Sequence, residues 1–467
     1  MRFRKIGVVL LALLLAAMAM VPIVSAEEEN SSDITQMQQN QTLKTSLITF
    51  DSLSTFNSQI LNEKRSVSAV SSSIAKYETL DIDASSLKTQ LLSGKQVPIH
   101  LNGVPYLMDL HEETFYPSAE TGVYTFNGKL VSAKNCRTLP KSSVQLTMDD
   151  SGVLGRISID SSEYVYLDEV SDDYPGNPEQ QIAYSSKDVT QHEIDLTNDL
   201  IVELPSGETK PVALLSDEEL NWMKTEQEKS NNQYSDSVET TSDQRSATVD
   251  SIVDVKLLIA TDNKMYTSYS NWKKRAQSVL NDANSAFGVD NIKIRLVPIF
   301  DDSKRMELSQ NFNPSSPFPV FVNIFNESYL DTQHADIAMY LSGKPFSGNA
   351  VGLSEGFDGG NKRYAVMSYE AMPPGYVANA QDRAYVFTHE LGHMFDGAHE
   401  IALNQIETYN RATTYPMNGV VKQTTMCVAV SQDPLIFSTN DGIHGDINHN
   451  NALRLQETKG VVSGYAS

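Results

Sequence analysis

Short runs of alternating apolar and polar residues follow one another from about residue 96, after a stretch of mixed helical spacing over 48–95. A period of two is typical of strands that bury one face. Turn-forming sequences separate these runs, among them Asn127-Gly128 and Asp150-Ser151-Gly152. The pattern predicts a β-rich module with strands over Ile99–Leu110, Val123–Val131, Val144–Met148, Leu154–Ile159 and Tyr164–Leu167.

After about residue 250 the pattern changes to strands that alternate with helices. Val253–Ala260 is an almost continuous apolar run, which is typical of a buried strand. Apolar residues at helical spacing predict an amphipathic helix over 266–287. The same reasoning predicts further strands at Ile292–Phe300, Val320–Ile324 and Asp336–Leu341, and an edge strand at Asn349–Ser354. The second half of the chain should therefore be a mixed α/β domain.

The N-terminus has the pattern of a signal peptide. Arg2, Arg4 and Lys5 precede the apolar run Ile6–Val21, and small residues follow up to Ala26. The alternative is an uncleaved membrane anchor, which needs about twenty apolar residues. We expect a secreted protein whose mature form has no membrane span.

A polar segment separates the two modules. Residues 224–247 contain almost no large apolar side chain and are crowded with Ser, Thr, Asn, Asp and Glu. Such segments are exposed and are where proteases cut. The predicted organisation is a signal peptide over 1–26, a β-rich pro-domain over 27–223, a linker with a processing site over 224–247 and a catalytic domain over 248–467.

Charge and cysteine content exclude several classes of protein. The net charge of the 467 residues is −23, which argues against nucleic-acid binding. Most of it lies in residues 27–247, where 16 basic face 36 acidic side chains, giving −20. Cys136 and Cys427 are the only cysteines, too few for a disulfide-rich scaffold.

The segment HELGHMFDGAHE at residues 389–400 holds three of the nine histidines. His389 and His393 are four residues apart, so on a helix they lie about 40° apart on one face and can bind the same zinc ion. His399 cannot follow on the same straight helix, because six residues rotate it by about 240°. The chain must turn before it, and Asp396-Gly397 tolerates the left-handed conformation that a turn requires.

Three neutral histidines leave the fourth zinc position open to water, which is typical of a catalytic site. Glu390 is adjacent to the first histidine and can act as a general base toward a zinc-bound water. The alternatives are a chance match on a surface helix and a structural zinc site. A structural site usually contains cysteine ligands.

HELGHMFDGAH resembles the metzincin signature HExxHxxGxxH. Thr424-Thr425-Met426-Cys427 resembles the methionine turn of that group, with Met426 as the turn residue and Met417 as its rival. The C-terminal segment from Phe437-Ser438 is similar to that of secreted reprolysin-like metallopeptidases, and the front module resembles their propeptide. The resemblance implies a metzincin-type catalytic domain, with a twisted mixed sheet and an active-site helix, after a β-rich pro-domain.

The sequence departs from the family pattern in two places. Asp396 occupies the position of the signature glycine, and Gly397 follows it. Glu400 follows the third histidine, where reprolysins usually have Asp and astacins Glu, so the subfamily stays open.

Two further sites are weaker predictions. Cys136 is a candidate zymogen thiol that could cap the zinc, although it could equally be a buried free thiol or pair with Cys427. The segment 446–457 has calcium-loop spacing at its ends but lacks the glycine at its sixth position. Capping of the last helix by Asn448 or Asn450 is the alternative to a calcium site there.

Residues and resemblance together predict a secreted zinc metalloendopeptidase, made as a zymogen and acting as a monomer on protein or peptide substrates. Glu390 would activate the zinc-bound water that hydrolyses the peptide bond. The alternative is a secreted binding or adhesion protein that retains a non-catalytic zinc site. Glu390 favours the enzyme, because a retired site has no chemical need for a base.

Overall fold

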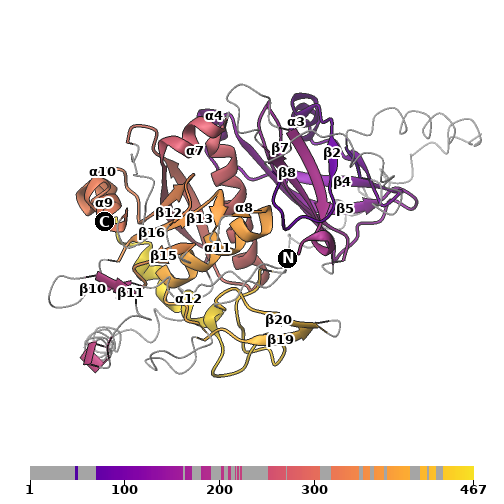
Figure 1. Cartoon of the computed structure of the whole chain (residues 1–467). Coiled ribbons are helices and arrows are strands. Elements are labelled where there is room, and N and C mark those ends of the chain that lie inside the picture. The colour runs from indigo at the N-terminus through magenta and orange to yellow at the C-terminus, as the bar shows by residue number, and fades with distance from the viewer. Residues whose placement is uncertain are drawn as a thin grey trace, which may run out of the picture. The chain divides into compact units, whose positions relative to one another are not determined.

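The structure of the chain is a computed structural model (Figure 1). The structure describes residues 48–50, 70–160, 163–170, 180–190, 201–203, 209–211, 216, 218–219, 221–222, 251–269, 271–304, 317–346, 351–357, 362–372, 376–399, 411–417, 420–427 and 435–466. The predicted signal peptide and the predicted linker at 224–247 lie outside these residues.

A nine-stranded sheet, here called the front sheet, forms the N-terminal part of the described chain. Its order is β1-β3-β4-β5-β6-β7-β8-β9-β2, and all neighbours are antiparallel except β1 and β3. The strands are β1 (Ile48–Phe50), β2 (Glu78–Leu80), β3 (Val97–Leu101), β4 (Val104–Glu112), β5 (Tyr124–Ser132), β6 (Ser143–Met148), β7 (Val153–Ser158), β8 (Tyr164–Val170) and β9 (Gln180–Ser185). The β-rich module is thus confirmed.

The front sheet has its own apolar core, in which helix α3 (Ala84–Leu92) packs its Leu87 and Leu91 against the strands. Two predictions were wrong: that Ile99–Leu110 is a single strand, and that Asn127-Gly128 is a turn between strands. The run Ile99–Leu110 is a hairpin, because Asn102 and Gly103 adopt left-handed φ values of 53° and 72° that reverse the chain. Asn127-Gly128 lies inside β5, where Gly128 allows the close approach of β4: a Cβ there would lie 2.0 Å from the Asp109 carbonyl oxygen.

The C-terminal part contains a five-stranded sheet of order β13-β12-β14-β16-β15. Its strands are parallel except for the antiparallel edge strand β15. They are β12 (Val253–Thr261), β13 (Ile294–Phe300), β14 (Ile337–Ser342), β15 (Gly352–Ser354) and β16 (Tyr364–Ser368). The predicted buried strand, two further strands and the edge strand are confirmed, with shifted ends.

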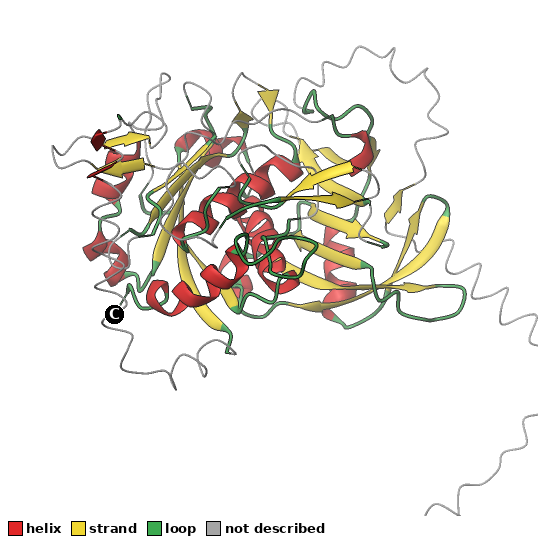
Figure 2. Cartoon of the chain, turned by 90° about the horizontal axis from the view of Figure 1, so that it is seen from below, coloured by secondary structure: helices red, strands yellow, loops and turns green. Residues whose placement is uncertain are grey.

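Helices cover both faces of this sheet (Figure 2). Alternate residues of β12 enter the two cores: Leu257 and Ile259 lie in the core with α8 and α11, and Leu258 and Ala260 lie in the core with α9 and α10. The helices are α7 (Asn263–Ser268), α8 (Trp272–Val289), α9 (Pro317–Ile324), α10 (Glu327–Thr332), α11 (Ala380–Met394) and α12 (Asn451–Val462). This two-sided burial explains the continuous apolar run of the strand.

Two helical regions differ from the predictions. The helix predicted over 266–287 is two helices, α7 and α8, because Tyr269 adopts an extended conformation that ends α7. The strand predicted at Val320–Ile324 was wrong, since these residues end helix α9. Short apolar runs do not distinguish a strand from a buried helix, and here Phe321 and Phe325 lie one helical turn apart in the core.

Small elements complete the fold. The described chain also has the 3₁₀ turn η3 (Ser186–Asp188), the helix α4 (Ser118–Thr121) and three two-stranded pairs: β10 (Ile201–Glu203) with β11 (Thr209–Pro211), β17 (Ala371–Met372) with β18 (Tyr376–Val377), and β19 (Thr414–Met417) with β20 (Val420–Gln423). Among the described helices, none combines the length and apolar character needed to cross a membrane.

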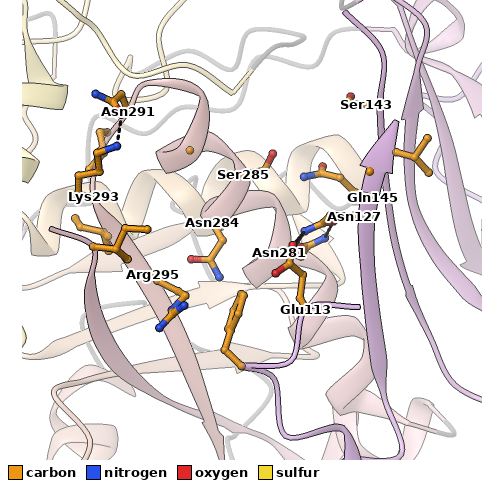
Figure 3. Close-up of a pocket in the computed structure, with 17 residues that line it drawn as sticks. Glu113, Asn127, Ser143, Gln145, Asn281, Asn284, Ser285, Asn291, Lys293 and Arg295 are labelled. Atoms are coloured by element: carbon orange, nitrogen blue, oxygen red, sulfur yellow. Dashed lines mark hydrogen bonds between the residues drawn. The ribbon is translucent and has the colours of Figure 1, made fainter. Parts of the chain in front are cut away.

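Helix α8 joins the two parts by burying a polar face. Its apolar face, which the sequence predicted, packs in the C-terminal core. Its opposite face carries Lys274, Gln277 and Asn281, which are buried against the front sheet. Asn281 and Asn127 of β5 exchange two amide hydrogen bonds of 3.0 Å, beside a cavity of about 350 Å³ whose lining is rich in amide side chains (Figure 3). The surface between the two parts therefore includes a buried polar stripe, beside apolar contacts that Phe115 and Tyr116 make with the C-terminal core.

Candidate metal centre

Helix α11 carries the first two histidines of the motif. It begins with a capping box, in which the Asn379 side chain accepts from the Asp382 amide and the Asp382 carboxylate accepts from the Asn379 amide. Burial raises the pKa of Asp382 to about 7. His389 and His393 lie one turn apart near the C-terminal end and are buried. The i, i+4 spacing thus places both rings on one face, as the sequence predicted.

The chain turns directly after α11, between Phe395 and His399. Asp396 is left-handed with a φ of 68°, and its amide donates to the His393 carbonyl at 3.0 Å. The next residue, Gly397, donates to the Gly392 carbonyl at 2.8 Å, and a Cβ on it would lie 2.9 Å from that oxygen. The two tasks of a turn glycine are therefore divided: Asp396 adopts the left-handed conformation and Gly397 makes the close backbone approach.

This turn brings the third histidine to the other two. The three Nε2 atoms of His389, His393 and His399 lie 3.0–3.1 Å from one another. They form the one group of potential metal ligands found among the described residues. His389 and His393 are buried and His399 is partly exposed, so the group faces solvent on one side.

Backbone carbonyls orient two of the rings. The Nδ1 atom of His389 lies 2.7 Å from the Thr425 carbonyl oxygen, and that of His393 lies 2.9 Å from the Gly397 carbonyl oxygen. Because a carbonyl only accepts, each Nδ1 must carry the proton and each Nε2 presents a lone pair. The Nε2 lone pairs of His389 and His393 then face each other at 3.1 Å, an arrangement that a cation bound between them would stabilise.

The triangle of nitrogens fits zinc. Three nitrogens at 2.0–2.1 Å from one ion, at tetrahedral angles, lie roughly 3.3 Å apart. The distances of 3.0–3.1 Å are within a few tenths of an ångström of that value. The three histidines could therefore hold one zinc ion and leave its fourth position open.

Glu390 lies between α11 and the edge strand of the sheet. Its side chain is fully buried. Gly352 of β15 is so close that a Cβ on it would lie 2.0 Å from Glu390 Oε1. Any larger residue at 352 would displace the carboxylate, so this glycine makes room for the candidate base.

Met426 lies beneath the histidines. It is fully buried, and a Cβ on Gly392 of α11 would lie 2.2 Å from its Sδ atom. Its neighbour Thr425 supplies the carbonyl that orients His389. Met417, the rival, ends β19. The structure thus places Met426 against Gly392 of the helix that carries two of the histidines, and its role as the methionine turn stays a prediction.

The weaker candidates lie elsewhere. Cys136 is exposed in a turn after β5 with a φ of 53°, and Cys427 is buried; the two form no disulfide with each other in this structure. Cys136 does not belong to the group of potential metal ligands. Asn450 caps α12 by accepting from the Leu453 amide, which was the alternative to calcium. A zymogen thiol and a calcium site stay predictions.

Helix α12 supplies contacts that the sequence did not reveal. The Asn451 side chain forms two hydrogen bonds with the backbone of Ala398, and the Arg454 side chain pairs with Asp396. These contacts join the turn to residues more than fifty positions downstream, and no local sequence pattern predicts them. The one available signal was the charged residue at the glycine position, which implies a partner of opposite charge.

The front sheet contacts the other end of α11. Arg383 donates to Asp168 of β8 at 2.5 Å, with both side chains buried. Tyr184 of β9 accepts from the Ala380 amide at 2.9 Å, and Asn379 donates to Ser73 at 3.0 Å. The front sheet therefore holds the beginning of the helix that ends in the histidines.

Comparison with known proteins gives one family match. Residues 253–433 match the model of Reprolysin_5, the metallo-peptidase family M12. No curated protein gives a significant match. Metalloproteinase-II from Bacteroides fragilis aligns at 10% identity and a TM-score of 0.45 over 80% of this chain and 96% of its own. A chain from a structure of a chaperone–substrate complex aligns at 13% identity and a TM-score of 0.34. The alignment covers 46% of the present chain and only 36% of the chain from that complex.

The family match and the histidine group agree. Residues 253–433 form a metallopeptidase domain of metzincin-like type, which follows a β-rich N-terminal region. The match supports zinc-dependent proteolysis in general, and His389, His393 and His399 are the group that could bind the metal.

Proposed function

We propose that the chain is a secreted zinc metalloendopeptidase of the reprolysin-like group, made as a zymogen. The observation that carries the proposal is the triangle of three Nε2 atoms at 3.0–3.1 Å, with a buried glutamate adjacent to the first histidine. Zinc held there would polarise a substrate carbonyl and lower the pKa of a water in its open position.

Glu390 is the general base of the proposed reaction. The carboxylate would take a proton from the attacking water and then pass it to the leaving amine. Its side chain is buried against β15, where the absence of a side chain on Gly352 leaves room for the carboxylate. The Thr425 and Gly397 carbonyls would keep His389 and His393 in the tautomer that binds metal.

Strand β15 is the proposed docking site for an extended peptide. It is the last strand in the order of its sheet, and it pairs with β16 on one side only. It packs against α11 at Glu390. The three residues of β15 are buried in this structure, so a peptide could add to its outer edge only in a form of the chain that exposes this edge. It would then make backbone hydrogen bonds that do not depend on sequence. Its scissile bond would then pass close to the base and the three histidines.

The front sheet is the proposed pro-region, removed by cleavage within 224–247 after export. Its polar contact with α8 supports this role, because a face made of amides and ion pairs can be exposed to water at lower cost than an apolar one. The front sheet also has an apolar core of its own. Both parts would therefore remain soluble after cleavage.

The test is proteolysis by the exported protein. The chain is produced with residues 1–26, its mature N-terminus is sequenced, and cleavage of a denatured protein is measured before and after zinc is removed with a chelator. We expect cleavage to stop on chelation and to return when zinc is restored. Cleavage that persists without zinc contradicts the proposal. A processed, zinc-loaded chain that cleaves no denatured protein favours the binding or adhesion function.

A further inference from the structure

The turn between the second and third histidines contains an aspartate where the related signature has glycine. Asp396 has a φ of 68°, in the left-handed region that is less favourable for aspartate than for glycine. Its amide still closes the turn on the His393 carbonyl. Something must offset this cost, since His399, three residues later, has to meet the other two histidines within 3.1 Å.

Arg454 of α12 supplies the compensating contact. Its Nε and Nη2 atoms both lie 2.5 Å from Asp396 Oδ2. The two side chains are 8% and 15% exposed, so the pair is largely shielded from water. A charge-assisted contact with two donors on one oxygen fixes the carboxylate more firmly than a single surface ion pair would.

Two other residues of α12 hold the backbone on either side of Asp396. Thr458 donates to the Phe395 carbonyl at 2.8 Å. Asn451 accepts from the Ala398 amide at 2.9 Å and donates to the Ala398 carbonyl at 3.2 Å. Ala398 is the residue directly before His399. One helix therefore contacts the turn at three points and leaves it little freedom.

We propose that Arg454, acting through Asp396, is a positioning residue for the third metal ligand. The inference rests on the proposed zinc site, but it concerns a contact of this chain that the signature itself does not contain. With glycine at 396 the turn would need no charged partner. With aspartate, the ion pair between Asp396 and Arg454 holds the less favourable left-handed conformation in place. His399 is then held in place before any metal binds.

The test is a double-mutant cycle on zinc affinity in the full-length chain. The probe is Zn²⁺ in competition with a chromophoric chelator, measured well below the melting temperature of every variant. We expect Arg454→Met to weaken zinc binding about 10- to 100-fold, which is the usual effect of losing an outer-shell partner. In an Asp396→Gly background the same substitution should change the affinity less than about 3-fold, because glycine needs no partner at that φ.

Two control variants separate positioning from general stability. Glu457 also contacts Arg454, at 3.5 Å, and is 39% exposed, so Glu457→Gln should leave the zinc affinity unchanged. Arg454→Lys keeps a positive charge near Asp396 and should recover part of the affinity. The visible spectrum of bound Co²⁺ should change in Arg454→Met and be normal in Glu457→Gln, since the spectrum reports ligand geometry.

Three outcomes overturn the inference. In the first, Arg454→Met lowers only the melting temperature of the metal-free chain. In the second, it weakens zinc binding equally in the wild-type and the Asp396→Gly backgrounds. In either case Arg454 is merely structural. In the third, the wild type binds no zinc, and the metal centre and the inference fail together. If the wild type binds zinc tightly but cleaves no peptide, only the proposed function fails and the cycle still decides the role of Arg454.

Discussion

The surface between the front sheet and the C-terminal part differs from the interior of either. Each part has an apolar core. The contact between them includes a buried network of charges and amides: Lys274 of α8 donates to Asp149 at 3.0 Å, to Ser151 at 2.9 Å and to Glu169 at 2.6 Å, and the lysine side chain is fully buried. Three acceptors satisfy the three donors of the ammonium group.

The two regions also differ in the pKa values of their buried carboxyl groups. At the contact surface, burial raises the pKa of Asp149, but Lys274 and hydrogen bonds from Ser151 outweigh it, so the pKa lies below its ordinary value. Inside the C-terminal part, burial raises the pKa of Asp290 to about 8, against the opposing hydrogen bond from the Phe437 amide. Pairing thus keeps Asp149 charged at the contact surface, whereas burial favours the neutral form of Asp290 in the C-terminal part.

The largest expected effect is the loss of bound zinc when one of the three histidines is removed. His393→Ala should lose bound zinc and peptide cleavage, because two remaining histidines form an incomplete ligand set. His111→Ala is the control in the front sheet, where the histidine side chain is 70% exposed, and it should behave as the wild type. Zinc content by elemental analysis and cleavage of a denatured protein are measured on both. Full zinc occupancy in His393→Ala would place the metal elsewhere.

The next effect tests the contact surface. Lys274→Met removes the cation that pairs with Asp149 and the nearer of the two cations of Glu169, which keeps Arg275 at 3.9 Å. The substitution should lower the free energy of unfolding by about 3–5 kcal/mol. Its neighbour Lys273 pairs with Asp302, which is 44% exposed, so Lys273→Met should cost about 0–1 kcal/mol. Chemical denaturation of the full chain measures both. Equal effects would mean that the buried network adds nothing beyond a surface pair.

The smallest expected effect is that Asp149→Asn and Asp290→Asn change the free energy of unfolding in opposite directions. The lowered pKa of Asp149 gives stability that is present above about pH 4 and lost as the pH falls through the lower, folded value. The raised pKa of Asp290 gives stability that is present below about pH 4 and lost as the pH rises toward 8. Asp149→Asn should therefore destabilise at neutral pH, and Asp290→Asn should stabilise at about pH 9. Denaturation across this range that gives both variants the same sign would contradict the comparison.

Local patterns predicted the elements whose burial is one-sided or complete. The alternation of β5 to β8 and the apolar run of β12 each correspond to a strand. The spacing of His389 and His393 predicted a shared helix face, and the structure brings His399 to it across a turn at Asp396. These features depend on residues close together in the sequence, which is why the sequence alone contained them.

Contacts between distant residues could not be predicted. Lys274, Gln277 and Asn281 form a polar stripe on α8 that looks solvent-exposed, and only the front sheet, more than a hundred residues earlier, buries it. Arg454 likewise acts on a turn 58 positions before it. The strand predicted at Val320–Ile324 was wrong for another reason, because apolar content alone fits a buried helix as well as a strand.

The central claim is that Glu390 is the base of a zinc peptidase, and one comparison tests it most directly. Wild type and Glu390→Gln, both zinc-loaded and both processed to the same N-terminus, are assayed on the same denatured protein. Glutamine keeps the size of the side chain but cannot accept the proton. We predict that kcat falls by about 10²- to 10⁴-fold while one zinc per chain is retained. Undiminished cleavage by zinc-loaded Glu390→Gln would contradict the account.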